Sequence, residues 1–318
     1  MSEYAFRDRL SASFPSQVII DVTEVCNLAC IHCPHPTFKK SEHYAARYLD
    51  PMLNAKAIDE IREHGGGHTQ YVRYTSEGEP LIHPGIYDML QYAVDHSGCF
   101  VTLTTNGTIL NAKRMRRLMQ TGLHMIDVSI DAFYPDTYAK IRVNGYLPTT
   151  EKNVIDMIHY ARGTPTRVVV SFVRQPLNWD EAEAFEARWR GMGAHEVVIR
   201  NLHSAAGAVI PVAQVMRALQ STGPKRTPCV YPWERIVLTP GGKLAFCPAD
   251  WTRGSTMVDY RTTTIKETWQ GEFYAKLRAA HLSNSFSCHK FCGQCPDWAV
   301  TKWPGEGRAY ADLVQEML

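Results

Sequence analysis

The stretch that decides the fold is IIDVTEVCNLACIHCPHP, residues 19–36, in which an apolar run leads directly into three cysteines. Cys26, Cys30 and Cys33 follow the spacing C-x3-C-x2-C. Thiolates this close together in one loop can hold three corners of a cubane iron–sulfur cluster and leave one iron open. An open position on a metal is typical of a catalytic site, whereas structural zinc takes four protein ligands. A zinc site completed by a neighbouring histidine remains the alternative.

Composition excludes several other classes of protein. The chain has 318 residues, 45% of them hydrophobic and 21% charged, which is typical of a soluble globular protein with one large domain or a large and a small one. A formal net charge of +2 gives no reason to expect a nucleic-acid or membrane-surface partner. No secretory signal and no apolar run long enough to span a membrane is visible, so we expect a cytoplasmic protein.

Nine cysteines are unevenly spread, with three near the N-terminus and five after Pro228. In a chain without an export signal, such groups indicate metal binding or catalysis more than disulfides.

Short β-rich runs alternate with amphipathic helical patterns between about Gln17 and Asn201. Six β-α repeats of this kind predict an α/β fold with a parallel sheet and right-handed crossovers. Periodicity alone leaves open whether the sheet is a partial barrel or an open doubly wound sheet. The expected strands are Val18–Val22, Gln70–Thr75, Phe100–Thr105, Met125–Ile130, Val168–Val173 and Glu196–Arg200.

Apolar residues at helical spacing fill the gaps between these strands. Gly122 follows one such pattern and is a typical residue just past a helix end. The expected buried faces are Leu53/Ala57/Ile61, Ile86/Leu90/Ala93, Met115/Leu118/Met119, Val154/Ile158/Ala161 and Phe185/Trp189.

The three-cysteine loop after a first strand resembles the fingerprint of the radical S-adenosylmethionine (SAM) superfamily, and the resemblance covers the chain from about residue 17 onward. It implies a partial (β/α)6 barrel over residues 17–203, preceded by an N-terminal extension, 1–16. It also implies a [4Fe–4S] cluster whose open iron binds the methionine part of SAM. In this family an electron from the cluster cleaves SAM to a 5′-deoxyadenosyl radical, which abstracts a hydrogen atom from the substrate.

Two segments match the family's SAM contacts near the first strands. His32 stands where the family usually has an aromatic residue beside the adenine. The segment YTSEGEPLIHP resembles the glycine-glycine-glutamate motif that meets the SAM amino group. Gly78 and Glu79 match its last two positions, and Glu77 replaces its first glycine.

Three further residues follow later strands at the matching positions. TLTTNG places Asn106 at the barrel mouth, and IDVSIDAFYPDTYAKIRV supplies Ser129 and Arg142. In the family such a serine and arginine meet the SAM carboxylate and ribose, and a guanidinium fits a carboxylate through two parallel hydrogen bonds.

The C-terminal part has a different composition. Residues 204–228 read as a linker, and 229–300 as a small cysteine-rich module that needs metal because its apolar residues are too few for a core. Its segment CVYPWERIVLTPGGKLAFC predicts a hairpin turning at Pro240–Gly242. Residues 301–318 are the tail, in which we expect a closing helix over Arg308–Leu318.

This module resembles the SPASM/twitch modules of radical SAM enzymes. Its five cysteines suit the shorter twitch form, which holds one auxiliary [4Fe–4S] cluster. The resemblance assigns Cys229, Cys247, Cys292 and Cys295 as ligands. Cys288 is left as a replacement ligand, a free thiol or a hydrogen donor. A zinc ribbon is the alternative, since two cysteine pairs also suit zinc.

The cysteine layout is most similar to twitch-type members that oxidise aminocyclitols, which implies oxidation of a secondary alcohol to a ketone in a carbohydrate- or cyclitol-like small molecule. The auxiliary cluster would take the second electron. An electron donor such as flavodoxin or ferredoxin is implied for the first cluster. Candidate residues around the substrate are Arg200, Asn201, His203 and Asp250, of which His203 or Asp250 would take the hydroxyl proton.

Three alternatives remain open. An epimerase acting on a sugar or peptide would use Cys288 as the thiol that returns hydrogen. Peptide modification is disfavoured by the lack of a peptide-binding extension before residue 17. A non-catalytic iron–sulfur or zinc-binding scaffold is disfavoured by the three-cysteine open site and the residues that match SAM contacts.

Overall fold

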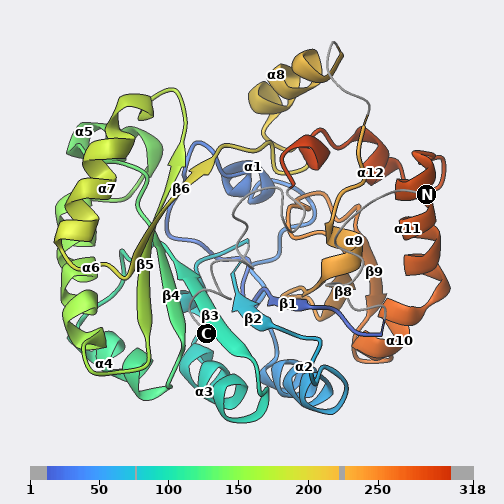
Figure 1. Cartoon of the computed structure of the whole chain (residues 1–318), viewed down its shortest axis with the longest axis horizontal. Helices are drawn as coiled ribbons and strands as arrows, with labels where there is room; N and C mark the ends of the chain where they lie inside the picture. The colour runs from blue at the N-terminus through green and yellow to red at the C-terminus, as the bar shows by residue number, and fades with distance from the viewer. Residues whose placement is uncertain (1–12, 76, 222–225, 302–318) are drawn as a thin grey trace.

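The computed structural model describes residues 13–75, 77–221 and 226–301. Six strands and the helices between them form the larger part of the molecule (Figure 1). The strands are β1 Gln17–Ile20, β2 Tyr71–Tyr74, β3 Phe100–Thr105, β4 Met125–Ser129, β5 Arg167–Arg174 and β6 Glu196–Asn201. The helices are α1 His35–Phe38, α2 Pro51–His64, α3 Ile86–His96, α4 Ala112–Gln120, α5 Pro135–Ile141, α6 Leu147–Ala161 and α7 Ala182–Gly191, with short 3-10 turns at Pro80–Ile82 and Trp179–Glu181.

The order of the strands decides between the two architectures that the sequence left open. Strands β1 to β6 are neighbours in chain order, and every pair among them is parallel. A doubly wound sheet reverses direction at a switch point, whereas this sheet winds one way throughout. The expected partial (β/α)6 barrel is therefore confirmed.

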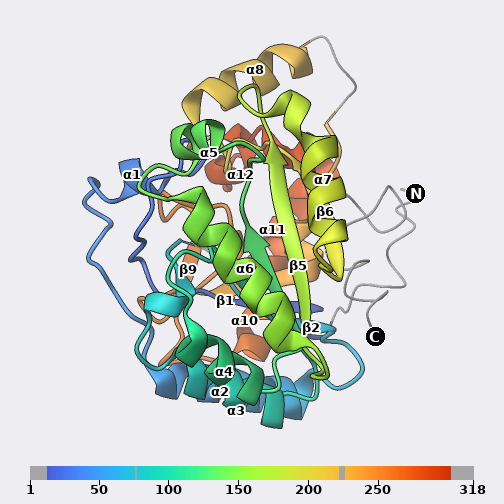
Figure 2. The same cartoon turned by 90° about the vertical axis from the view of Figure 1, so that its left-hand side faces the viewer.

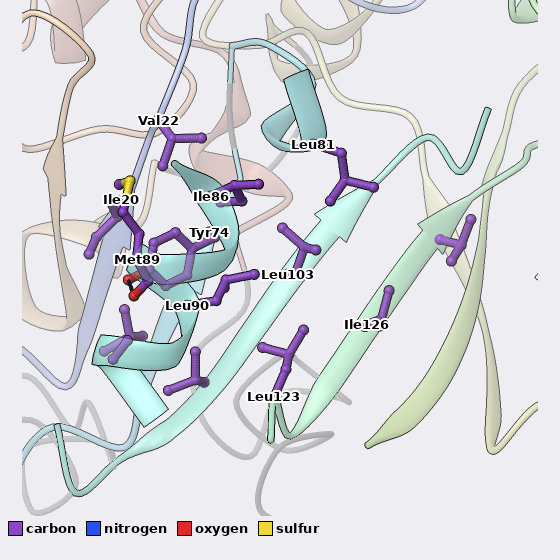
Figure 3. Close-up of a cluster of buried hydrophobic side chains, with 14 of the residues drawn as sticks. Ile20, Val22, Tyr74, Leu81, Ile86, Met89, Leu90, Leu103, Leu123 and Ile126 are labelled. Atoms are coloured by element: carbon purple, nitrogen blue, oxygen red, sulfur yellow. Dashed lines mark hydrogen bonds between the residues drawn. The ribbon is translucent and has the colours of Figure 1, made fainter. Parts of the chain in front are cut away.

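Helices cover one side of the sheet, and the predicted apolar faces are the ones they bury. Figure 2 shows α6 and α7 over β5 and β6. The side chains of Ile20, Tyr74 and Leu103 point to the same side of the sheet and pack with Met89 and Leu90 of α3 (Figure 3). Gly122 follows α4 with a φ of +67°, a conformation that favours glycine. The predicted helix end is thus confirmed.

The inner face of the sheet is closed at one end by a separate apolar cluster. Tyr71, Phe100, Met125 and Val169 contribute one side chain each from four neighbouring strands. Residues two positions further along these strands are polar, because side chains on one face recur with a period of two. The barrel therefore has an apolar floor and a polar interior above it.

The C-terminal module continues the same sheet. Its elements are α9 Tyr231–Glu234, β7 Arg235–Leu238, β8 Lys243–Ala245, β9 Thr256–Asp259, α10 Ile265–Gln270, α11 Glu272–Ser283, α12 Lys290–Gln294 and a 3-10 turn at Asp297–Ala299. The predicted hairpin is confirmed, since β7 and β8 pair antiparallel. Strand β7 also pairs parallel with β1, with Val18 beside Ile236 and Ile20 beside Leu238.

Residues 204–228, expected as a linker, contain the helix α8 Ile210–Ser221. This helix buries Ala213 and leaves Ile210, Val215 and Leu219 exposed. The closing helix expected over Arg308–Leu318 lies outside the described residues. Within the described part of the chain, no helix is both long and apolar enough to cross a membrane.

Helix α2 fastens the module to the barrel. The Glu60 carboxylate accepts hydrogen bonds from the Tyr260 hydroxyl and the Ile265 backbone N–H, both at 2.7 Å. Lys56 donates to the carbonyls of Tyr260 and Thr263, both at 2.6 Å. The two bonds to Glu60 are buried, so losing the carboxylate leaves buried donors unpaired.

We therefore predict that Glu60→Ala lowers the free energy of unfolding by about 2–3 kcal/mol, because two buried donors lose a charged acceptor. Urea unfolding of the cluster-loaded protein measures it. Glu63→Ala, one of the same residue type on the same helix but largely exposed, is the control and should change stability by less than about 0.5 kcal/mol. Equal midpoints for the two variants would contradict this account of the docking.

Candidate functional site

The three-cysteine loop leaves the C-terminal end of β1 and is fixed against the segment that follows α5. Ala29 N–H donates to the Val143 carbonyl and Ile31 N–H to the Ile141 carbonyl, each at 3.0 Å. Cys33 N–H donates to the Cys30 carbonyl at 3.1 Å, which makes the last turn of the loop tight. The backbone thus presents three thiols from one short loop at the carboxyl ends of the strands, where α/β folds collect functional groups.

The chemistry of these thiols fits a metal cluster. Burial raises the pKa of Cys26 to about 11 and that of Cys33 to about 12. Such thiols ionise only when a nearby positive charge or a metal compensates them. The Arg142 guanidinium lies 3.6 Å from the Cys30 sulfur, and its buried Nε has no partner within the described residues. Three thiols, of which that of Cys30 is buried, and an unpaired buried donor beside them suit a cluster with an anionic ligand.

Arg142 is held in place by Asp131, which lies just past β4. Arg142 Nη2 is 2.5 Å from Asp131 Oδ2, and His32 Nε2 is 3.4 Å from the same oxygen. Asp131 has a φ of +67°, which is rare for a residue with a side chain and often marks a functional site. His32 is buried, which lowers its pKa to about 4, and its Nδ1 lies 3.3 Å from Gln175 Nε2.

Three hydrogen bonds fix the side chain of Glu79, two of them from residues at the end of β3. Its carboxylate accepts from Thr105 Oγ1 at 2.6 Å, Asn106 N–H at 2.8 Å and Leu81 N–H at 3.1 Å. Its own N–H donates to the Val25 carbonyl at 2.9 Å. Burial raises the pKa of Glu79, and these hydrogen bonds oppose the rise. The side chain is thus positioned immediately beside the cysteine loop.

Gly78 has no space for a side chain. A Cβ there would lie 2.4 Å from the Thr23 carbonyl oxygen and 2.5 Å from that of Val25, both backbone atoms that cannot move aside cheaply. The Gly78–Glu79 segment therefore lies directly on the strand end that leads into Cys26. This close approach explains why the second glycine of the motif is present although the first is replaced.

The other predicted SAM contacts lie around the same mouth. Asn106 Nδ2 donates to Asn27 Oδ1 of the cysteine loop at 2.9 Å. Ser129 lies at the end of β4, with its hydroxyl 3.3 Å from that of Ser171. Their contacts with SAM stay predictions, because the geometry shows only that they are near the loop and the barrel interior.

A charged group occupies the interior above the apolar floor. Asp127 is fully buried, with Arg200 Nη2 at 2.8 Å and Arg73 Nη2 at 3.9 Å from its Oδ2. Burial acts to raise the pKa of Asp127, but Arg200 and then Arg73 hold it below its usual value. These residues come from β4, β6 and β2, so the predicted candidate Arg200 does face the interior of the barrel.

The second cysteine group is assembled from three separate segments of the module. The thiols of Cys229, Cys247, Cys292 and Cys295 are close enough for each to perturb the ionisation of others, and all four have raised pKa values because they are buried. Arg226 lies beside them and donates to the Cys292 carbonyl at 2.7 Å. No group of three or more His, Cys, Asp or Glu side chains in the described residues is arranged to hold a single metal ion.

The four remaining candidates, Cys288, Asp250, His203 and Asn201, are placed differently from one another. Cys288 is exposed and lies near Ser287, with a sulfur–oxygen distance of 3.8 Å. Asp250 is buried and accepts hydrogen bonds within its own loop, from Thr252 N–H at 2.9 Å and Ser255 N–H at 2.7 Å. The Asp250 carboxylate therefore organises a loop in this structure.

His203 lies in the segment after β6, with Nδ1 3.8 Å from Asp297 Oδ2 of the module. It is also close enough to His32 to contribute to the lowering of that residue's pKa. Asn201, the last residue of β6, is exposed. Of the predicted mouth residues, His203 is thus the one placed between barrel, module and cysteine loop.

Sequence reasoning missed Asp127, Arg73 and four other charged residues at the site. Asp131 carried a signal, since it stands two residues past the strand-end Ser129, where functional groups gather. Neither Glu24 nor Arg253 gave a recognisable signal in the sequence, because the contact between them joins residues far apart in the chain. Glu77 was noticed only as a departure from a motif, and burial raises its pKa to about 7 against the opposing effect of Arg253.

Two family models match the chain. The first, the Radical SAM superfamily, matches residues 20–187. The second, SPASM, described as an iron-sulfur cluster-binding domain, matches residues 229–296. The two matched ranges contain the two cysteine groups described above.

Curated relatives and solved structures agree with these matches. GTP 3′,8-cyclase of Alkaliphilus oremlandii is 31% identical over 169 residues, which cover 52% of this chain and 50% of that protein. The chain thus matches about half the length of such relatives. The fold is similar to BtrN in complex with AdoMet and 2-DOIA (TM-score 0.58, 16% identity, 88% and 92% of the two chains). It is also similar to Streptococcus suis SuiB bound to precursor peptide SuiA, with a TM-score of 0.67 and 14% identity. That match covers 98% of this chain and 75% of SuiB.

From the packing of Gly78 we predict that Gly78→Ala weakens SAM binding at least tenfold, a loss of about 1.4 kcal/mol. The added Cβ must push the Glu79 segment away from the cysteine loop. Isothermal titration of the cluster-loaded protein with SAM measures it. Gly66→Ala is the control, since a Cβ there meets nothing within 4 Å. Unchanged SAM affinity in Gly78→Ala would show that this segment is not part of the pocket.

Proposed function

Because the chain belongs to the radical SAM superfamily, we propose that it oxidises a secondary alcohol to a ketone in a carbohydrate- or cyclitol-like small molecule. The observation that carries the proposal is the second cysteine group. Four thiols can coordinate all four corners of an auxiliary cluster, which leaves no open iron to bind substrate. A fully coordinated cluster near the barrel mouth is suited to accept an electron.

The interior of the barrel suits a substrate with many hydroxyl groups. Asp127, which is buried, forms a polar layer with the partly exposed Arg200 and Arg73, and the Ser129 and Ser171 hydroxyls lie one step nearer the mouth. A site built from buried hydrogen-bonding groups selects substrates that pair with them, because an unpaired buried polar group is costly.

When bound, the first cluster supplies the electron that cleaves SAM, and the auxiliary cluster supplies an acceptor for the electron left on the substrate. For each turnover, one hydrogen atom passes from the carbinol carbon to the 5′-deoxyadenosyl radical, the hydroxyl proton goes to a base, and one electron goes to the acceptor. We propose His203 as that base, because the Asp250 carboxylate is engaged within its own loop. Glu79 and Arg142 are proposed to hold the amino and carboxylate groups of SAM. A flavodoxin- or ferredoxin-type protein is proposed as the donor of the first electron.

The alternatives receive less support. An epimerase needs a thiol that reaches the substrate, whereas Cys288 is exposed and its sulfur lies 3.8 Å from the hydroxyl of its chain neighbour Ser287. Peptide modification has the likeness to SuiB in its favour, but at 14% identity this concerns the fold alone. A non-catalytic scaffold would not need Glu79 and Arg142 positioned around an open three-cysteine site.

We predict that turnover in deuterium oxide gives a product lighter than the substrate by two hydrogens, with no solvent deuterium at the oxidised carbon. Oxidation removes an electron from the substrate radical, whereas epimerisation returns a hydrogen atom from a thiol. Mass spectrometry of products from a panel of cyclitols and sugars measures this.

Cys288→Ala provides the matched test of the alternative, since a dehydrogenase should keep its turnover rate without that exposed thiol. A product of unchanged composition that carries one solvent deuterium, together with loss of turnover in Cys288→Ala, would contradict the dehydrogenase proposal and support an epimerase.

A further inference from the structure

A loop of the C-terminal module reaches across to the cysteine loop of the barrel. Arg253 in this loop pairs with Glu77 through both oxygens, with Nη1–Oε1 at 2.5 Å and Nη2–Oε2 at 2.9 Å. The same Nη2 lies 2.9 Å from Oε1 of Glu24, two residues before Cys26. One guanidinium therefore joins the module to both segments that flank the SAM site.

The ion pair is built from buried groups. The side chains of Glu24 and Glu77 are 0% and 4% exposed, and that of Arg253 is 20% exposed. A carboxylate is buried at this depth only when a cation or several donors compensate it. Glu77 stands where the family motif has its first glycine, so this carboxylate is not part of the motif itself.

The module holds Arg253 in an unusual backbone conformation. Its φ is +62°, which costs energy for a residue with a side chain. Asp250 stabilises the loop around it by accepting from Thr252 N–H and Ser255 N–H. The strain is thus offset by a hydrogen-bonded turn that aims one guanidinium out of the module.

Aromatic rings seat the same loop on the barrel side. The Arg253 guanidinium lies 4.9 Å from the centroid of the Phe38 ring, which follows the cysteine loop in α1. Trp251 packs edge-on against Phe38, with ring centroids 5.5 Å apart. The contact of Arg253 with the two glutamates is therefore part of a packed interface and not an isolated surface pair.

We propose that Arg253 is a positioning residue that couples SAM binding to the seating of the auxiliary module. Through Glu77 it fixes the backbone of Gly78 and Glu79, and through Glu24 it fixes the strand end against which Gly78 packs. The affinity for SAM then depends on a residue that lies outside the barrel. The inference rests on the assignment of the Gly78–Glu79 segment to SAM.

The test is Arg253→Met in the protein loaded with both clusters. Met keeps length and apolar packing but removes the cation, so SAM should bind at least about tenfold more weakly, as expected for the loss of charge-assisted hydrogen bonds. The change that SAM causes in the electron paramagnetic resonance (EPR) spectrum of the reduced first cluster should weaken in parallel. Arg253→Lys should recover part of both. Arg261→Met, which removes a half-exposed arginine of the same module, should change neither.

Two further variants separate the ways in which the inference can fail. Glu77→Gln breaks the same ion pair from the barrel side. Its SAM affinity and EPR spectrum test the inference even if Arg253→Met fails to fold. Wild-type SAM affinity and spectrum in the Arg253 or Glu77 variant, with affinity lost in Glu79→Ala, would overturn the coupling alone. Wild-type affinity in Glu79→Ala would overturn the assignment of the segment to SAM.

Discussion

Strand β1 is the constraint on which the rest of the structure depends. Its four residues are buried and pair in parallel on both sides, with β2 of the barrel and β7 of the module. The chain leaves its C-terminal end directly into the loop of Cys26, Cys30 and Cys33. One short strand therefore fixes the position of the first cysteine group relative to the barrel, and the position of the module relative to both. Because register in a buried sheet is strongly specified, a slip here would misplace both cysteine groups at once.

The charged contacts around this strand make the arrangement specific. Glu79 follows β2, Asp131 follows β4 and Arg142 caps the end of α5, and all three converge on the cysteine loop, each held by buried hydrogen bonds or ion pairs. Buried pairs of this kind contribute less to stability than to a unique geometry, since their attraction is offset by the cost of removing charge from water. Catalysis that depends on placing a substrate carbon close to a reactive group needs such geometry. The same logic extends to the module through Glu77 and Arg253.

Much of the fold could be predicted from the sequence because period-two and helical patterns record burial directly. The six strands and the apolar faces of α2, α3, α4, α6 and α7 were recognisable for this reason. The pairing of β7 with β1 was not, since strand order leaves no periodic signal. Helix α8 was missed although it is amphipathic, because the small residues before it and the Gly- and Pro-containing stretch after it indicated a linker. Among site residues, the cysteines and Glu79 were found by spacing and resemblance. Arg253 could not be found, because its partner lies 176 positions away in the chain.

The most direct test of the central claim, that two separate cysteine groups hold two clusters and only the first cleaves SAM, is an iron count combined with an assay for 5′-deoxyadenosine. Anaerobically reconstituted protein should contain about eight irons per chain. Replacing Cys26, Cys30 and Cys33 together by Ala should leave about four irons, with the auxiliary cluster intact, and abolish 5′-deoxyadenosine formation. Stoichiometric zinc with little iron, or undiminished SAM cleavage in the triple variant, would contradict the account.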